Sequence, residues 1–314
     1  MTRFLLWRAL QTAIAMLGVS VAVFLIVQLV PGDPIRLALG TRFDEELYQA
    51  MRARAGLDQP LLTQYGRWLA RALTGDLGVS FRSGEPVTRL LLARLGPTSL
   101  LAGAALAVAL AIALPLGIVS AVRSGSLVDR IATGFSQLWI SVPDFWSGIM
   151  YILLFALLLG WLPASGYVSP LDDPVRAARH LVLPAMTVGL ISGSVLTRFV
   201  RSAVLEALHQ DYARTARAKG LSRWQTVRRH VLPNAWISIV TAVGLQLGFL
   251  LGGVVIVEVI FEWPGLGRLA YDAVVRRDYS LLQGAVLAIA LMFLVVNFLV
   301  DLLYGYLDPR VRRR

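Results

Sequence analysis

The most basic part of the sequence is one short stretch, residues 206–235. Six of them oppose two acidic ones: Arg214, Arg217, Lys219, Arg223, Arg228 and Arg229 against Glu206 and Asp211. Uncharged runs flank the stretch, at 181–197 and 235–257. A basic segment between two apolar runs is typical of a connection held at one face of a membrane by positive charge. The chemistry that it offers is binding, to lipid headgroups or to a partner protein.

Spacing within this stretch predicts two short helices joined by a turn. The first carries apolar and small residues at helical intervals, at Leu205, Leu208, Tyr212 and Ala216. Gly220 follows a basic last turn, which is the usual place of a helix C-terminal cap. Glycine is favoured there because it adopts a positive φ without strain.

The second helix begins with the S-x-x-Q spacing of a capping box, Ser222 and Gln225. Trp224, Val227 and Val231 share its next face, and Pro233 is expected to end it and to start the following span. Spacing alone leaves two interpretations open. The stretch is either an amphipathic segment that lies on lipid headgroups or a docking element for a protein at that membrane face.

The sequence of 314 residues gives little support for a catalytic site or a metal site. There is no cysteine, and the three histidines (His180, His209 and His230) lack metal-ligand spacing. No phosphate-binding G-x-x-x-x-G-K-[ST] motif occurs, so this chain does not bind ATP by that route. The small residues 192–194 lie within an apolar run, where they favour close helix packing over nucleophilic catalysis. We expect no cofactor on this chain and no enzymatic activity of its own.

Composition indicates a membrane protein. Hydrophobic residues make up 57% of the chain and charged residues only 16%. The net charge of +11 does not indicate nucleic-acid binding, because the basic residues lie at the ends of apolar runs and not on a soluble face.

Apolar runs predict six membrane spans, at about 9–30, 95–122, 131–162, 181–200, 235–260 and 279–303. The third is too long for one straight span and contains Pro143, so we expect a helix kinked or broken there. The first is too long for a cleaved signal peptide and is interpreted as a retained span.

Polar residues inside these runs are costly and carry functional hypotheses. Asp144, Glu258 and Asp301 lie near span ends or the break, where pairing with arginines is a simpler interpretation than a proton relay. Gln137, Gln246 and Asn297 are uncharged. Together with Asp144, these three could line a path or form interhelical hydrogen bonds, and both roles stay open.

The orientation follows from the short connections, where sixteen lysines and arginines fall on one side and five on the other. Both termini and the basic stretch are therefore predicted to be cytoplasmic. Residues 31–95 are then an extracytoplasmic insertion, and their mixed charges predict an ordered segment. A helix is expected from 44–46 to Gly56, and a second one carries Leu61, Leu62, Tyr65, Trp68, Leu69 and Leu73 on one face. That face is expected to pack over the outer mouth of the helix bundle.

The run DYARTARAKGLS…HVLPNA resembles the cytoplasmic loop of binding-protein-dependent ABC importer permeases. In that family the loop has the pattern E-A-A, then three residues, a glycine, nine residues and I-x-L-P. In this sequence Arg214-Thr215-Ala216 occupies the E-A-A position, and His230 occupies the position of the isoleucine. This departure is typical of the dipeptide, oligopeptide and nickel branch. Residues 31–34 (PGDP) and 75–80 (GDLGVS) are similar to the N-terminal region of the first-permease type of that branch.

The resemblance implies an all-α membrane protein with six transmembrane helices, the type I importer permease (MetI-like) fold, and a helical extracytoplasmic insertion after the first helix. It implies three parts: residues 1–94, the core 95–305 with a coupling loop at 204–234, and a basic cytoplasmic tail 306–314. The coupling residues would be Glu206, Asp211, Tyr212, Arg214, Thr215, Ala216, Arg217, Lys219, Gly220 and Leu221.

The resemblance also implies partners in a bacterial inner membrane. These are a second, homologous permease forming a heterodimer, two ATP-binding subunits that hold ATP and Mg²⁺, and an extracytoplasmic substrate-binding protein. Substrates of the branch include dipeptides, longer peptides, glutathione and nickel complexes. Peptide is the default, because the outward segments hold no His/Cys/Met cluster. A transporter working alone is the alternative from a different class; paired, broken helices with central charges would favour it, and only one break is indicated.

Overall fold

The computed structural model describes residues 2–29, 45–46, 48–49 and 59–307. All elements named in this part of the chain are helical. They are α1 (Thr2–Leu29), α4 (Leu61–Leu73), α5 (Val87–Val122), α6 (Leu127–Ser141), α7 (Asp144–Tyr151), η2 (Ile152–Leu158), α8 (Pro174–Leu208), α9 (Asp211–Ala218), α10 (Arg223–Thr226), η3 (Val227–Val231), α11 (Leu232–Ile260), α12 (Leu266–Val275) and α13 (Tyr279–Leu307). Two of them, η2 and η3, are π-helical.

In the described part of the chain, five helices are long and apolar enough to cross a membrane, and the bent pair α6–α7 makes a sixth span if it is counted as one. The five lie at Leu6–Gln28, Val87–Val122, Pro174–Leu208, Arg223–Ile260 and Tyr279–Leu302. Only 11–61% of the most apolar window of each is buried within the chain, so much of their apolar surface is left for lipid or for other subunits. This agrees with the six spans predicted from the sequence.

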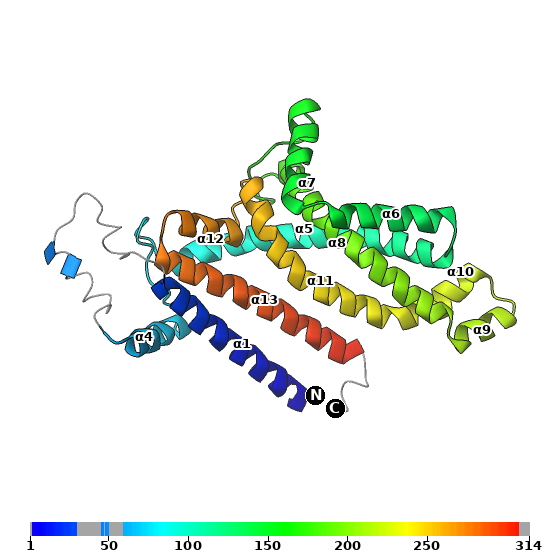
Figure 1. Cartoon of the computed structure of the whole chain (residues 1–314), viewed down its shortest axis with the longest axis horizontal. Coiled ribbons are helices and arrows are strands. Elements are labelled where there is room, and N and C mark those ends of the chain that lie inside the picture. The colour runs from blue at the N-terminus through cyan, green and yellow to red at the C-terminus, as the bar shows by residue number, and fades with distance from the viewer. Residues whose placement is uncertain (1, 30–44, 47, 50–58, 308–314) are drawn as a thin grey trace. The chain divides into compact units, whose positions relative to one another are not determined.

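The third span is broken at Pro143. Helix α6 ends at Ser141, α7 begins at Asp144, and their axes differ by 99°. Val142 and Pro143 are extended, with ψ values of 126° and 140°, because proline disfavours helical conformation in the residue before it. Figure 1 shows α7 turned away from the line of α6. Of the two predicted alternatives, kinked or broken, the structure shows the broken one.

The chain divides into two compact units, to both of which α5 and α13 contribute. The first unit comprises residues 1–5, 99–263 and 295–314, and α8 lies at its centre with α6, α7 and α11 packed on it. Glycines permit close contact with α5: a Cβ at Gly189 would lie 2.7 Å from Val108 Cβ, and one at Gly193 would lie 3.0 Å from the Ala109 carbonyl oxygen. The prediction that the small residues around Gly193 serve helix packing is confirmed.

The second unit comprises residues 6–98 and 264–294. Its apolar core joins the start of α5 to α12 and α13 through residues such as Val87, Leu266 and Leu281. Asp278 is 1% exposed and caps α13 by accepting from the Leu281 N–H at 3.2 Å. The same carboxylate accepts from Ser80 Oγ at 2.5 Å, which fixes the turn before α5. Gly78, within that turn, has φ +81°, a conformation that glycine adopts without strain.

Several boundaries differ from those predicted. Helix α5 begins at Val87 and runs through the expected boundary between residues 94 and 95. Helix α12 lies between the predicted fifth and sixth spans, and α8 begins at Pro174, before the predicted start of the fourth span at about 181, with Asp173 as its cap. The helix expected between residue 44 and Gly56 lies largely outside the described residues, as does the tail beyond residue 307.

Candidate functional site: the α9–α10 hairpin

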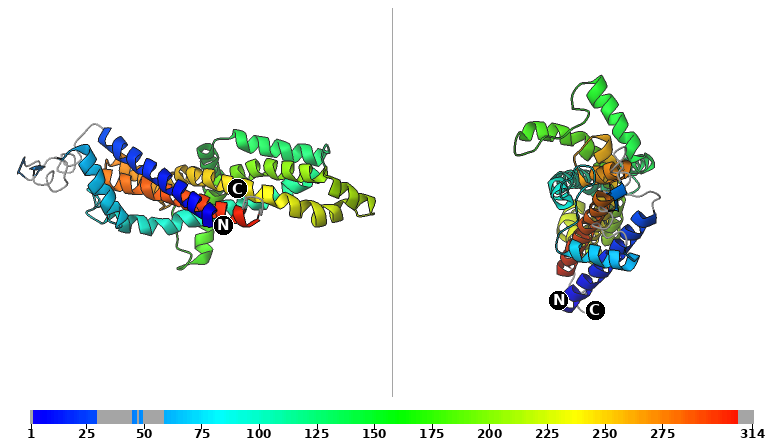
Figure 2. Two further views of the ribbon diagram at one scale, coloured as in Figure 1. Left: turned by 90° about the horizontal axis from the view of Figure 1, so that it is seen from below. Right: turned by 90° about the vertical axis from the view of Figure 1, so that its left-hand side faces the viewer.

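The basic stretch folds as a hairpin beyond the shared end of α8 and α11 (Figures 1 and 2). Helix α8 continues to Leu208, so Leu205 and Leu208 belong to it and not to the short helix that carries Tyr212 and Ala216. The chain turns at His209 and Gln210, and α9 begins at Asp211. The helical spacing noted in the sequence therefore spans two helices of different direction.

Arg217 closes the turn between these two helices. Its guanidinium Nη2 donates to the carbonyl oxygen of Leu208 at 3.2 Å, and its Nε donates to that of Ala213 at 3.3 Å. The last carbonyl groups of a helix lack partners in their own helix and carry partial negative charge. Arg217 thus satisfies the end of α8 and ties α9 to it, which is a structural role that its sequence position did not reveal.

The end of α9 is a complete Schellman motif. The N–H of Gly220 donates to the carbonyl of Arg217 at 2.9 Å, and that of Leu221 to the carbonyl of Ala216 at 3.4 Å. Gly220 has φ +87°, the left-handed conformation that glycine adopts at little cost. The predicted C-terminal cap is confirmed.

The start of α10 is the predicted capping box. Ser222 Oγ accepts from the Gln225 N–H at 3.4 Å, and Gln225 Oε1 accepts from the Ser222 N–H at 2.9 Å. The expectation that Pro233 ends this helix is wrong: α10 runs through the π-helical turn η3 into α11. The wider turn at Val227–Val231 accommodates a proline ring that would otherwise clash with the carbonyl group four residues earlier.

Small apolar residues hold the hairpin together. Ala213 and Ala216 of α9 are 0% and 5% exposed, and Val227 and Val231 of η3 are fully buried. Apart from Ala216, they belong to one apolar cluster that also contains the ends of α5 and α8, through residues such as Val122 and Val204. Ala216, one of the expected coupling residues, is therefore part of the hairpin's core and not of its surface.

The outer face of the hairpin is basic and aromatic. The remaining expected coupling residues are exposed or, for Leu221, half-buried: Glu206, Asp211, Tyr212, Arg214, Thr215, Arg217, Lys219 and Gly220. Tyr212 is 37% and Trp224 51% exposed, and Trp224 is not buried on the face it was expected to share with Val227. Partial burial raises the pKa of the Tyr212 phenol, and the negative charge of Glu206 adds to this. Because it stays protonated, this phenol remains available as a hydrogen-bond donor.

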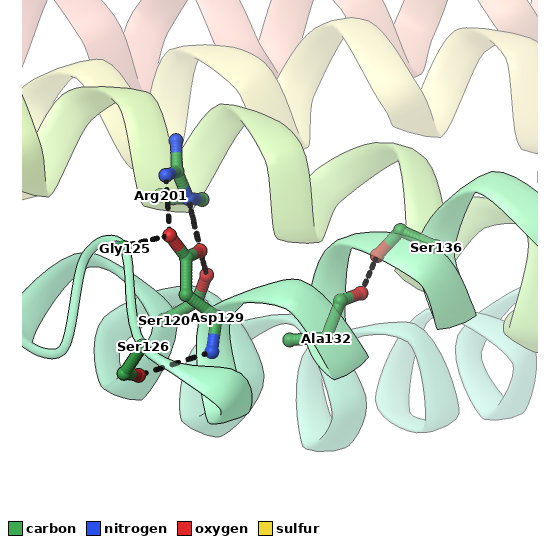
Figure 3. A network of polar contacts seen from close by, with 7 residues as sticks. All are labelled: Ser120, Gly125, Ser126, Asp129, Ala132, Ser136 and Arg201. Carbon is green, nitrogen blue, oxygen red and sulfur yellow. Dashed lines mark hydrogen bonds and ion pairs between the residues drawn. The ribbon is translucent and has the colours of Figure 1, made fainter.

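A partly buried ion pair fixes α8 shortly before the hairpin (Figure 3). Arg201 of α8 donates from Nε and Nη2 to the two carboxylate oxygens of Asp129 at 2.7 and 2.8 Å. Asp129 also accepts from Ser120 Oγ and, at 2.8 Å, from the N–H of Gly125. Arg201 stands seven residues before the end of α8, about 10 Å along the helix. The pair therefore joins α5, α6 and α8 close to the base of the hairpin.

Sequence reasoning missed this pair. Helix α6 begins at Leu127 with Ser126 as its N-cap, so Asp129 lies inside the helix, with 5% of its surface exposed. Its partner is 72 residues further along the chain. The signal that could have indicated the pair is an acidic residue and an arginine, each next to a long uncharged run. A charge that is buried beside such a run needs an opposite charge close to it.

The four expected path residues lie on four different helices, α6, α7, α11 and α13. Asp144 is the first residue of α7, half-buried, with one carboxylate oxygen 3.3 Å from the position that a Cβ on Gly253 of α11 would take. Gln246 and Asn297 are half-buried on α11 and α13, and Gln137 is exposed on α6. Whether they line a path stays a prediction. Glu258 is fully buried and Asp301 half-buried.

Within the described part of the chain, no group of three or more His, Cys, Asp or Glu side chains could hold a metal ion. The hairpin is thus a protrusion with capped turns and a basic and aromatic surface, joined to the membrane helices by an apolar cluster and a partly buried ion pair. It can bind another macromolecule and transmit movement to α8 and α11.

Two family models match the chain. Residues 113–313 match the binding-protein-dependent transport system inner membrane component, and residues 1–102 match the N-terminal region of such membrane components. The dipeptide transport system permease protein DppB of Escherichia coli (strain K12) is 39% identical over 338 aligned residues that cover all of both chains. A putative peptide transport system permease protein of Brucella abortus (strain 2308) is 40% identical and covers 99% of each chain.

Among solved structures, a chain of the MetNI methionine ABC transporter in an inward-facing conformation is similar with a TM-score of 0.60 and 19% identity. The similarity covers 71% of this chain and 99% of that one, and at this identity it shows the fold alone. The type I importer permease fold expected from the sequence is confirmed. The chain therefore belongs to the inner membrane components of binding-protein-dependent transport systems, and it is a multi-pass permease subunit of an ABC importer.

Proposed function

We propose that this chain forms, with a second and similar permease, the path by which an ATP-driven importer moves dipeptides and oligopeptides across the inner membrane. The observation that carries the substrate class is the full-length 39% identity to a dipeptide permease. Nickel complexes and glutathione are the alternative substrates for the same architecture. The partners are two ATP-binding subunits, which hold ATP and Mg²⁺, and an extracytoplasmic substrate-binding protein.

The hairpin supports the proposed mechanism. A transporter that works alone has no need of a protruding element whose turns are fixed by backbone and side-chain caps and whose outer face carries Tyr212 and Trp224. Docked in an ATP-binding subunit, this element would pass the closure of the ATPase pair to α8 and α11, which lead directly into it. The spans would then reopen to the outside. Nucleotide binding would thus shift the equilibrium between two arrangements of the helix bundle.

Uptake in cells tests the substrate class. A strain lacking this permease should lose accumulation of a radiolabelled dipeptide and regain it with the chain supplied in trans. Excess unlabelled dipeptide should compete for that uptake, whereas glutathione and Ni²⁺ should not. Restoration of Ni²⁺ or glutathione accumulation without any effect on dipeptide uptake would contradict the peptide assignment.

Reporter fusions test the proposed orientation. Fusions after Arg123, after Gln225 and at Arg314 should report a cytoplasmic location, because most short-loop lysines and arginines lie on that side. Fusions near Ser83, Ser169 and Asp272 should report the opposite side. A cytoplasmic result at Ser83 would contradict the proposed topology.

A further inference from the structure

Helix α4 is strongly amphipathic, yet none of its residues is buried. Its apolar face carries an alanine, aromatic residues and leucines: Leu61, Leu62, Tyr65, Trp68, Leu69, Ala72 and Leu73. Arg67 and Arg71 stand on the opposite face, and both are exposed. An isolated helix of 13 residues is marginal in water, so α4 must gain its stability from surfaces against which its apolar face packs.

One edge of that face packs against α1 (Figure 1). Phe24 of α1 lies 5.4 Å from the ring of Tyr65 in an edge-to-face arrangement and 6.0 Å from that of Trp68. The hydroxyl groups of Tyr65 and Ser20 are hydrogen-bonded at 2.9 Å, and Ser20 is 3% exposed. These contacts account for the aromatic edge of α4, and they place it beside a membrane span.

The other edge has no protein contact of this kind in the described part of the chain. Leu62 and Leu73 are 84% and 80% exposed. On a helical projection Leu62 and Leu73 lie within about 20° of each other, since eleven residues make just over three whole turns. They form a leucine edge that extends the aromatic edge around the helix, at about 60–80° from Tyr65.

The contacts with α1 fix the depth of α4. The apolar span runs to Gln28, whose side chain donates to Gln64 at 3.1 Å, whereas Tyr65 reaches Ser20, about 12 Å further into the span. The contacts therefore cover the last two turns of the span, where the hydrocarbon core gives way to headgroups. Tyrosine and tryptophan are enriched at that level. A leucine edge held at this depth meets acyl chains, and arginines on the opposite face meet lipid phosphates.

We propose that α4 is an interfacial anchor: it lies in the leaflet that contains the C-terminal end of α1, with Leu62 and Leu73 among acyl chains and Arg67 and Arg71 at headgroup phosphates. Amphipathic helices of this kind bury their apolar face about 5–10 Å into the boundary between headgroups and acyl chains. The anchor holds the segment before α5 on the membrane surface, and it does not depend on which substrate the importer carries.

Spin labels test the proposal cleanly, because the chain contains no cysteine. We would label four single-cysteine variants in the assembled transporter, reconstituted in phosphatidylethanolamine and phosphatidylglycerol. They form two pairs: Leu62→Cys with its neighbour Thr63→Cys, and Leu73→Cys with Ala70→Cys. Collisions with molecular oxygen report lipid, and collisions with a water-soluble nickel chelate report water. The ratio of oxygen to nickel collisions should be several-fold higher at Leu62 and Leu73 than at Thr63 and Ala70.

Two results would overturn the anchor. Equal and high nickel collision rates at all four positions would place the leucine edge in water. Low collision rates with both reagents at Leu62 and Leu73 would show that protein covers that edge, whether the rest of the insertion or another subunit. Retained uptake by each labelled variant is the control for correct assembly.

Discussion

The α9–α10 hairpin and α4 are both short polar segments next to membrane spans, yet they are secured in different ways. The turns of the hairpin are fixed by hydrogen bonds to its own backbone, through Arg217, the Schellman motif at Gly220 and the capping box at Ser222. Helix α4 begins at Leu61, and its N-cap residue, Pro60, offers no side-chain cap. The contacts that hold α4 are aromatic rings and two side-chain hydrogen bonds to α1.

The way in which each segment is fixed matches the surroundings proposed for it. Backbone caps define the shape of the hairpin whatever lies outside it, so it can act as a rigid body in a partner's groove. Side-chain packing on one span defines the depth of α4 but tolerates tilt, which suits a fluid lipid boundary. Substitutions in the hairpin should therefore affect coupling to ATP hydrolysis, and those in α4 should affect uptake with the ATPase still assembled.

The largest effect is expected at the base of the hairpin, from Arg201→Met. The substitution leaves the carboxylate of Asp129 buried without its cation, which typically costs about 3 kcal/mol or more. The thermal midpoint of the purified complex should fall by several degrees, and substrate-stimulated ATP hydrolysis should be lost. The double variant Asp129→Asn/Arg201→Met should recover much of the stability. If it were no more stable than Arg201→Met alone, the ion pair would not be the reason for the loss.

The next effect is expected at the turn of the hairpin, from Gly220→Val. A β-branched residue at φ +87° costs about 1–2 kcal/mol, although open space surrounds the position. Gly220→Asn is the matched control, since asparagine tolerates the left-handed region. We expect Gly220→Val to insert normally and to reduce substrate-stimulated ATP hydrolysis several-fold, with Gly220→Asn close to wild type. Normal coupling in the valine variant would contradict a role for hairpin shape.

A smaller effect on stability is expected in α4. Replacing Trp68 and Leu69 with serine removes a ring contact with Phe24 and half-buried apolar surface, worth about 1–2 kcal/mol locally. Uptake should fall while the ATP-binding subunits still copurify with the complex. Serine at Leu61, which is 54% exposed, is the control for added polarity. If the ATP-binding subunits no longer copurified with the Trp68/Leu69 variant, α4 would also affect assembly with the ATPase. That result would contradict the functional distinction between α4 and the hairpin.

The smallest effect is expected from Arg214→Ala. Its contact with Asp211 is 3.7 Å long and both side chains are highly exposed, so the pair contributes at most about 0.5 kcal/mol. The thermal midpoint should stay within error of wild type. Any change in coupling would then report a contact between Arg214 and the partner, and it should be weaker than that of Gly220→Val.

Local signals predicted the caps at Gly220 and Ser222 and the break at Pro143, because each depends on residues a few positions apart. Apolar length likewise predicted the spans. The long-range polar contacts were not predictable in this way. Asp129 meets Arg201 across 72 residues, and Asp278 meets Ser80 across 198. The continuation of α10 through Pro233 was missed, since a π-helical turn that accommodates proline has no simple sequence signature.

The most direct test of the account asks whether the hairpin is covered by an ATP-binding subunit. A single cysteine at Lys219, an exposed residue at the end of α9, would be the only thiol of this chain. In membranes holding the complete importer, it should be protected from a membrane-impermeant maleimide and should cross-link to the ATP-binding subunit through a short linker. Without that subunit it should label freely. Equal labelling with and without the ATP-binding subunit, and no cross-link, would contradict the docking role of the hairpin.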